Sequence, residues 1–487
     1  MLGIRRVFGV ASALCALSTV VHAEDLYADF HVPEHRSFSC LLRSGGSGSW
    51  SNSNTGFGTS HASSGSGQLS SQLSWSSESE ARLSDVRLET SVDGGQTRFR
   101  DRPFPTSEAT RLQRQGDQRL ALHGGERCYF GGSMLAVELS AGALLDFHQF
   151  VSSEARRDLN GTFEDFIGSE NLAHFYGQQG TVSVSVGHGR VRDVSGVFAT
   201  QLIEQRLLAT GRLAHALSPG ARLRLAQLHY IADDFVAAHD RPSRYFWREA
   251  ERVLREDGAL REGTLDAYTL ERLLEPAFRS ATFRRTTGCF VGPFWFGNET
   301  RGHRDAEIRL SRTVLDNGTL IFNDFSSSSQ RTSLDEQQAG VGMSGEVHRP
   351  MGMRWQTDAF ASTSYEVGPR RAWGAFASLQ AEYMIADRWH ASAQLRHQLR
   401  SRRLNGTRTE PAWRFDSAAG LSYLVEDSWS IDAEFFTIQS QSRDGDFSLS
   451  PSYQRASRLT FGLTYRPFGR FAAPGLGLSE HLATPTL

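Results

Sequence analysis

Residues 375–399 read AFASLQAEYMIADRWHASAQLRHQL, and this stretch decides the fold. From Ala375 to Ile385 every second residue is apolar or aromatic, and the same holds for most alternate residues from Trp389 to Leu399. Side chains of a β-strand point alternately to two faces, so each half predicts a strand with one apolar and one polar face. Strands of soluble sheets typically have about five or six residues, whereas a strand that crosses a bilayer has about 9–11. The length of each half therefore favours a membrane-crossing strand.

The pattern recurs along the chain. Residues 135–147 alternate in the same way, and 379–393 map onto 419–433 with an offset of 40 residues. Each copy of this repeat is a strand, a tight turn containing Asp, and a second strand that begins with Trp. We expect the aromatic residues around the turn to lie at a membrane interface, where amphipathic rings settle; they are Tyr383, Trp389, Tyr423 and Trp429. The alternative is a repeated hairpin of a soluble protein.

The first 23 residues predict an export signal. Arg5 and Arg6 precede an apolar run that ends at Val21, and Ala23 supplies the small residue at the expected cleavage site. The run is too short for a membrane-spanning helix. The mature chain would retain Cys40, Cys128 and Cys289, which allow at most one disulfide in an oxidising compartment.

Composition excludes several classes of function. The chain has 52 basic and 54 acidic residues, a formal net charge of −2, and no separate basic block. A nucleic-acid partner requires clustered cationic surface, so none is expected. Neither metal-ligand spacing nor a nucleotide-binding motif is present, and we predict no cofactor and no metal site.

Composition and hydrophobic periodicity divide the rest of the chain into segments. Residues 24–66 are rich in Ser and Gly and predict a flexible segment, because they contain too little apolar surface to fold. Alternation over 67–195 and 284–468 predicts two parts of one β-structure, and 469–487 are left as a tail. Between the two parts, 196–283 change to a helical period.

Residues 196–283 predict four to five helices in an inserted domain. An apolar run begins at Phe198, Ser218 and Pro219 form a helix-start signal, Pro242 opens a third helix and Thr264 a fourth. The functional interpretation is a periplasmic domain that docks a protein or cell-wall partner. The alternative is a plug or lid at the mouth of the β-structure.

These features together resemble bacterial outer-membrane β-barrel proteins. The resemblance covers the signal, most of 67–195 and nearly all of 284–468, including a last strand that closes near Phe468. It departs from the class in one respect, since 19 residues follow the terminal aromatic residue. It implies a mainly β fold, a transmembrane antiparallel barrel in the bacterial outer membrane, with lipid and the barrel-assembly machinery as partners and the helical insert in the periplasm.

Strand counting predicts a barrel of about 14 strands, with 12 to 16 as the range. Ten strands are expected after the helical insert and about four before it. In that arrangement Asp316-Asn317-Gly318 forms a short turn on the inner side, between strands at 304–315 and 319–325. The Ser-rich stretch 326–336 forms an outer loop.

The polar faces of these strands supply the candidate lumen residues. They have mixed charge, which suits a hydrophilic passage without strong ion preference. The candidates are Glu138, Asp146, His148, Glu382, Arg388, His390, Arg396, Asp432 and Glu434.

Two local patterns have alternative interpretations. Glu138, Asp146 and His148 could serve as acid and base in an outer-membrane hydrolase, but no nucleophile motif accompanies them. In the stretch from Gly187 to Asp193, two glycines could form an anion-binding loop. The favoured interpretation is that Gly187 and Gly189 permit a bend where the β-structure meets the insert, with the neighbouring charges pairing locally.

The leading functional hypothesis is a porin-like outer-membrane channel that is not an enzyme. The second is a barrel-anchored interaction, export or envelope-assembly component without an open pore, and the third is the hydrolase.

Overall fold

A computed structural model describes the chain from residue 34 to 468 with several gaps. The gaps are 56–57, 105–106, 131–133, 161–162, 232–234, 236–241, 262–263, 267–268, 270–284, 317–318, 368–370, 387, 405–406, 409–411, 427–428 and 443–451. The predicted signal 1–23 and the tail 469–487 lie outside the described residues.

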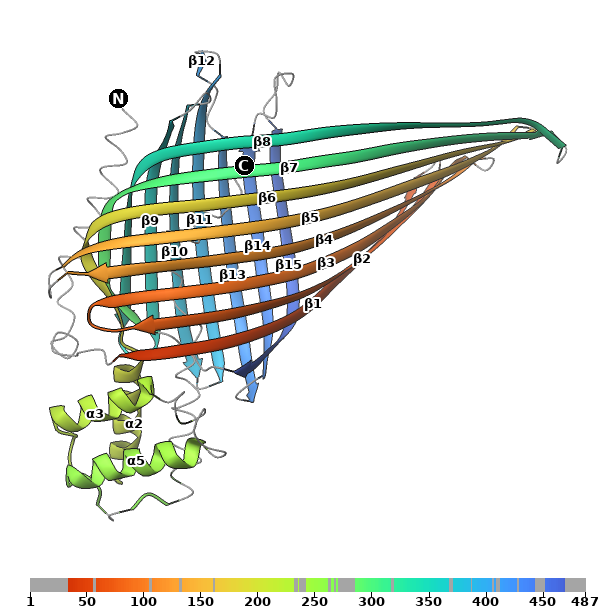
Figure 1. Cartoon of the computed structure of the whole chain (residues 1–487). Coiled ribbons are helices and arrows are strands. Elements are labelled where there is room, and N and C mark those ends of the chain that lie inside the picture. The colour runs from red at the N-terminus through yellow and green to blue at the C-terminus, as the bar shows by residue number, and fades with distance from the viewer. Residues whose placement is uncertain are drawn as a thin grey trace.

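Long antiparallel strands dominate the structure, and three helices interrupt them (Figure 1). The strands before the helices are β1 (His35–Thr55), β2 (Gly58–Glu78), β3 (Arg82–Phe104), β4 (Ser107–Tyr129), β5 (Leu135–Asn160) and β6 (Phe163–Asp193). The helices are α2 (Ser195–Ala209), α3 (Pro219–Tyr230) and α5 (Pro242–Glu256). The strands after them are β7 (Thr286–Asp316), β8 (Thr319–Met351), β9 (Trp355–Val367), β10 (Ala372–Ala386), β11 (Trp389–Leu404), β12 (Thr407–Arg408), β13 (Ala412–Glu426), β14 (Trp429–Ser442) and β15 (Ser452–Phe468).

The sheet closes on itself. Each long strand pairs with its neighbours in chain order, and β1 pairs with β15 to complete the ring, while the two-residue β12 only caps the end of β11. The pairing of β1 with β15 covers only Cys40–Gly46, whereas β1 pairs with β2 along its whole length. Apart from β12 the barrel has 14 strands, so the predicted strand number and fold class are confirmed.

The predicted distribution of strands was wrong. Six strands precede the helices and eight follow them, because the stretches 289–297 and 304–315 belong to one strand, β7. Likewise 319–325, the Ser-rich 326–336 and 339–348 all lie in β8. Asp316 and Thr319, where β7 ends and β8 begins, therefore lie at the end of the barrel opposite the helices, and not on the inner side where the turn was predicted. We call this end the distal rim, and the end where the helices attach the helix rim.

These errors in the strand boundaries arise because parts of the long strands are polar on both faces of the sheet. β8 has 33 residues and, at about 3.3 Å per residue, is roughly 110 Å long, far more than a bilayer requires. Its first half, Thr319–Asp335, is exposed on both faces, so it needs no apolar alternation. Figure 1 shows β1–β8 continuing together as a long extension past the shorter strands β9–β15.

The prediction of a flexible segment at 24–66 was wrong for the same reason, because a strand that is polar on both faces has no apolar alternation in its sequence. Residues 35–55 form β1 and 58–66 form the start of β2, paired from His35↔Glu78 to Thr55↔Gly58. Backbone pairing, which does not depend on an apolar face, orders this Ser/Gly-rich sequence. The segment is thus part of the barrel wall over the residues that the structure describes, and not a flexible arm.

An apolar exterior surrounds the barrel. The odd-numbered residues of the short strands point outward, and their large apolar members are exposed; they include Leu379, Ile385, Leu395, Leu421, Ile431, Phe435, Leu459 and Phe461. Exposed apolar side chains on a closed sheet are stable only against lipid. Among the described residues, no helix is long and apolar enough to cross a membrane.

Aromatic pairs line the helix rim on the short-strand side. Trp389 packs on Tyr423 with ring centroids 4.8 Å apart, and Trp429 on Tyr465 at 4.4 Å. A third pair, Trp355 with Tyr383 at 4.3 Å, extends the series to β9 and β10. The four predicted aromatic residues therefore lie together at this rim, and their place at a membrane interface stays a prediction.

The helices form a small body with its own core between β6 and β7. Ile203, Leu207, Leu225, Phe246 and Leu254 are almost fully buried against one another. The Ser218 hydroxyl accepts a hydrogen bond from the amide of Ala221 at 3.2 Å, which confirms the predicted helix start. A helix after Thr264 falls mostly outside the described residues.

Arg285 fixes this helical body to the barrel. Its backbone amide donates to the hydroxyl of Ser195 (2.8 Å), and its guanidinium donates to the carbonyl oxygen of Met353 (2.8 Å) and lies 4.9 Å from the ring centre of Phe198. Tyr230 adds a second link by donating to the carbonyl oxygen of Asp193 (2.6 Å).

We expect Arg285→Met to loosen the helices without unfolding the barrel. A hydrogen bond from a charged group contributes about 1.5–3 kcal/mol, so amide hydrogen exchange in α2 should accelerate by about tenfold or more. Mass spectrometry of exchange in the folded protein measures this. Arg252→Met on the exposed face of α5 is the control and should leave exchange in α2 unchanged; equal protection in both variants would contradict the link.

Candidate functional site in the barrel lumen

A ladder of paired charges covers the inner face of β4 and β5. Glu138, Asp146 and His148 each lie opposite a residue of β4 in the antiparallel register, and each binds that residue. Glu138 accepts from Arg127 (2.6 Å), and His148 Nδ1 lies 2.7 Å from an oxygen of Asp117. Asp146 is 3.9 Å from Arg119. Because each side chain has its own partner, the three do not form a common acid–base site.

The remaining predicted lumen residues are spread around the wall. Glu382 accepts from Gln380 (2.8 Å), and Asp432 accepts from the hydroxyls of Ser422 (2.6 Å) and Thr464. His390 is half-buried on the inward register of β11, and Arg396 and Glu434 are exposed on the inward registers of β11 and β14. Arg388 is exposed in the turn between β10 and β11 and not on a strand, and its lumen-facing position stays a prediction.

A buried charge network crosses the lumen near the helix rim. Arg127 is 2% exposed and binds two carboxylates, Glu138 on β5 and Glu346 on β8, each at 2.6 Å. His348 extends the network, at 3.5 Å from Glu346 and 2.8 Å from Asp358. These residues come from four different strands, which the network ties together.

β6 and β7 each contain a glycine with an unusual backbone conformation near the helix rim. The backbone of Gly189 has a φ of 121° and that of Gly288 a φ of 108°, values that side-chain-bearing residues rarely adopt. A Cβ on Gly187 would lie 2.5 Å from the ring of Phe290. The predicted bend at the glycines is confirmed.

Of the charges predicted to pair locally beside the glycines, Arg190 pairs across the barrel end. Arg190 donates to a carboxylate oxygen of Glu80 (2.5 Å), which lies in the turn between β2 and β3, and Arg192 approaches the same oxygen at 4.0 Å. The contact of Arg190 with Glu80 therefore links β6 to the turn between β2 and β3 at the helix rim.

Four phenylalanines line the lumen beyond the charge network. Phe294 and Phe296 come from β7, Phe360 from β9 and Phe376 from β10, and they pack as two pairs with ring centroids 5.9 Å apart. Phe294 and Phe296 cover Gly342 and Gly340 of β8, where a Cβ would lie 2.5 Å from each ring. The glycines thus make room for the rings on the inner face.

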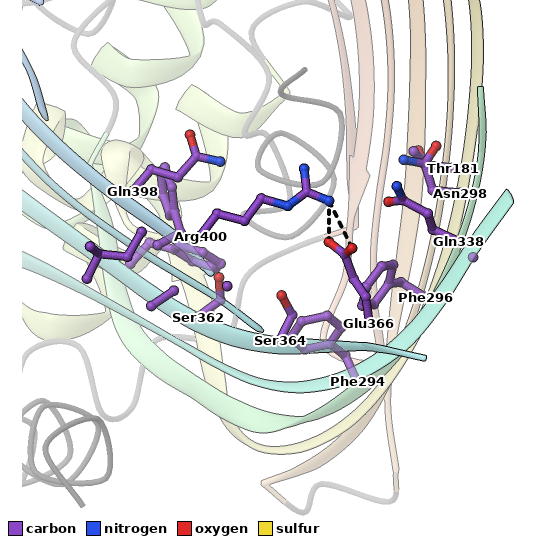
Figure 2. A pocket seen from close by; sticks show the side chains of 16 residues that line it. Thr181, Phe294, Phe296, Asn298, Gln338, Ser362, Ser364, Glu366, Gln398 and Arg400 are labelled. Atoms are coloured by element: carbon purple, nitrogen blue, oxygen red, sulfur yellow. Dashed lines mark hydrogen bonds and ion pairs between the residues drawn. The ribbon is translucent and has the colours of Figure 1, made fainter. Parts of the chain in front are cut away.

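A cavity of about 100 Å³ adjoins these rings (Figure 2). Polar side chains complete its wall: Thr181, Asn298, Gln338, Ser362, Ser364, Glu366, Gln398 and Arg400. Arg400 extends across the cavity toward Glu366, and its Nη2 donates to both carboxylate oxygens at 2.8 Å.

Arg400 has further donors that the described residues do not satisfy. The side chain is 6% exposed, and neither its Nε nor its Nη1 has a hydrogen-bond partner there. A buried donor without an acceptor costs about 1–3 kcal/mol, and more when the group is charged. The cavity therefore combines an apolar ring surface with an incompletely bonded cation.

Sequence reasoning found Glu138 but missed Arg127, Glu346, Glu366 and Arg400. A usable signal existed for Arg400, because it lies four residues beyond Arg396 on the same face of one strand. No signal existed for Glu346 as a partner of Arg127, since the two come from β8 and β4, which are not neighbours in the sheet. Within the described residues, no group of three acidic, His or Cys side chains has the spacing of a metal site, and Cys40, Cys128 and Cys289 form no disulfide there.

Comparison with known proteins gives distant structural similarity alone. No protein-family model and no curated protein sequence matches the chain. The toluene transporter TodX of P. putida is similar with a TM-score of 0.33 and 9% identity, over 90% of this chain and 91% of that one. The translocator domain of the autotransporter NalP from Neisseria meningitidis has a TM-score of 0.22 and 9% identity, over 94% and 98%. OmpT, an outer membrane protein of Vibrio cholerae, has a TM-score of 0.26 and 7% identity, over 88% and 97%.

The chain's own geometry defines its class. A closed antiparallel sheet, an apolar exterior, aromatic pairs at one rim and a polar inner face describe a transmembrane β-barrel of the bacterial outer-membrane type.

Proposed function

We propose that this protein is an outer-membrane channel through which small solutes pass passively. The observation that carries the proposal is the cavity inside the closed wall, lined by side chains from β6 to β11. Eight of the sixteen residues that line the cavity have polar side chains, while large apolar side chains cover the outside of the barrel. This distribution suits a barrel with a solvated interior, since a barrel without one needs only an apolar core.

The proposal includes an orientation. In barrels of this class short turns lie in the periplasm and longer connections outside. On the short-strand side, the strand bounds leave two or three residues between β8 and β9, β10 and β11, and β13 and β14 at the helix rim, against four to nine between β9 and β10, β11 and β13, and β14 and β15 at the distal rim. The helix rim is accordingly the periplasmic one, and the helical body is placed beside the periplasmic mouth, where a protein or cell-wall partner would reach it.

Conductance of the purified protein in a planar bilayer tests the channel. We expect discrete current steps, and we expect Ser362→Trp, which adds a large ring on the cavity wall, to reduce their size to about half or less. Ala361→Trp is the matched control, because the neighbouring residue points to the lipid side of the same strand. A folded barrel without current steps would contradict the channel and favour a closed anchor.

A further inference from the structure

We propose that the cavity at Arg400 binds a small aromatic carboxylate, of the size of benzoate. This inference deepens the proposed channel function by naming a class of solute, and it rests on the same lumen.

The phenylalanines provide the surface for an aromatic ring. Phe294, Phe296, Phe360 and Phe376 line one side of the cavity. Aromatic pairs prefer offset or edge-to-face contacts with ring centres about 4.5–7 Å apart, and a cluster of four offers such contacts to one more ring. The volume of about 100 Å³ is on the scale of an apolar cavity known to take up benzene, about 150 Å³. The volume is thus of the scale of one aromatic ring.

Arg400 provides the recognition of the carboxylate. Glu366 occupies only Nη2, and the buried Nε and Nη1 have no acceptor among the described residues. A guanidinium has five N–H donors, and a carboxylate is its strongest common acceptor. Amide and hydroxyl groups of Gln398, Asn298 and Ser364 also line the cavity, from β11, β7 and β9, and can donate to the carboxylate.

Arg127 shows that one guanidinium in this lumen holds two carboxylates. It binds Glu138 through Nη2 and Glu346 through Nη1, and the ring of Phe290 lies 4.0 Å from its guanidinium carbon. Arg400 with Glu366 and an aromatic carboxylate would repeat this arrangement. The repulsion between Glu366 and the bound carboxylate is thereby offset by the shared cation.

Equilibrium binding to the folded, detergent-solubilised protein tests the inference. Isothermal titration with benzoate should give a saturable site, whereas toluene, which lacks the carboxylate, and acetate, which lacks the ring, should each bind at least about tenfold more weakly. Equal binding of toluene and benzoate, or no binding of benzoate, would overturn it.

Substitutions locate the site. Arg400→Met should weaken benzoate binding by about tenfold or more, and Arg396→Met, on the same face of the same strand but outside the cavity, should not change it. Glu366→Gln removes the competing carboxylate and should tighten binding several-fold, about threefold or more. If Arg400→Met fails to fold, Glu366→Gln alone tests the site. Unchanged or weaker binding of benzoate to Glu366→Gln contradicts it.

The two proposals fail in different ways. A protein that binds benzoate but carries no current contradicts the channel and keeps the site. A protein that conducts but does not bind benzoate contradicts the site and keeps the channel.

Discussion

Gly189→Ala is expected to abolish the folded barrel. The backbone at this position has a φ of 121°, and a Cβ there would overlap the carbonyl oxygen of Cys289 on the neighbouring strand. The backbone cannot shift to relieve that overlap, because β6 and β7 are paired in register on both sides of Gly189. The assembled barrel should therefore be reduced to a small fraction of the wild-type amount.

Electrophoretic mobility of unheated against boiled membrane protein measures the loss. A closed barrel resists detergent until it is heated, so the wild-type protein should migrate at two positions and Gly189→Ala only at the unfolded one. Gly180→Ala is the matched control on the same strand, since nothing lies within 4 Å of a Cβ at that position. Two positions for Gly189→Ala would mean that the backbone conformation at Gly189 is not required for closure.

Arg127→Met is expected to cause the largest loss of stability among barrels that still assemble. The substitution leaves Glu138 and Glu346, which are 1% and 8% exposed, without the cation between them. Glu346 keeps only His348, at 3.5 Å, and removal of one partner of a buried ion pair typically costs about 3–5 kcal/mol, because it leaves a buried charge without adequate compensation. We expect a decrease of that size in the free energy of unfolding.

Urea unfolding in lipid vesicles, followed by tryptophan fluorescence, measures the decrease. Arg119→Met is the control on the same strand: its side chain is 44% exposed and lies 3.9 Å from Asp146, so the change should stay within about 0.5 kcal/mol. The triple variant Arg127→Met, Glu138→Gln and Glu346→Gln should recover part of the loss, because it leaves no buried charge at the three positions. Equal stability of Arg127→Met and Arg119→Met would show that water reaches the network.

The sequence predicted the short-strand side of the barrel well. Where one face meets lipid, as at Leu379 or Leu421, apolar side chains must alternate with polar ones, and this pattern is visible without a structure. The glycines at 187 and 189 were also informative, since two glycines inside a strand suggest a bend.

The long strands were harder to predict for a physical reason. The first half of β8 and most of β1 have no apolar face, and a strand held by backbone pairing alone looks like a loop in sequence. The buried charge network and the cavity at Arg400 were harder still to predict from the sequence. Arg127 and Glu346 are 219 residues apart in sequence, and Arg400 and Glu366 meet only because β9, β10 and β11 stand side by side.

The short pairing of β1 with β15 sets an order of events in assembly. These two strands stand at opposite ends of the chain, so their contact carries the largest loop-closure entropy of any in the barrel and gains the fewest ladder hydrogen bonds in return. Every other neighbouring pair can form while the chain is still being added to the sheet. We therefore expect the ring to close last at this junction and to open there first, which makes the β1–β15 junction the kinetic weak point of the wall.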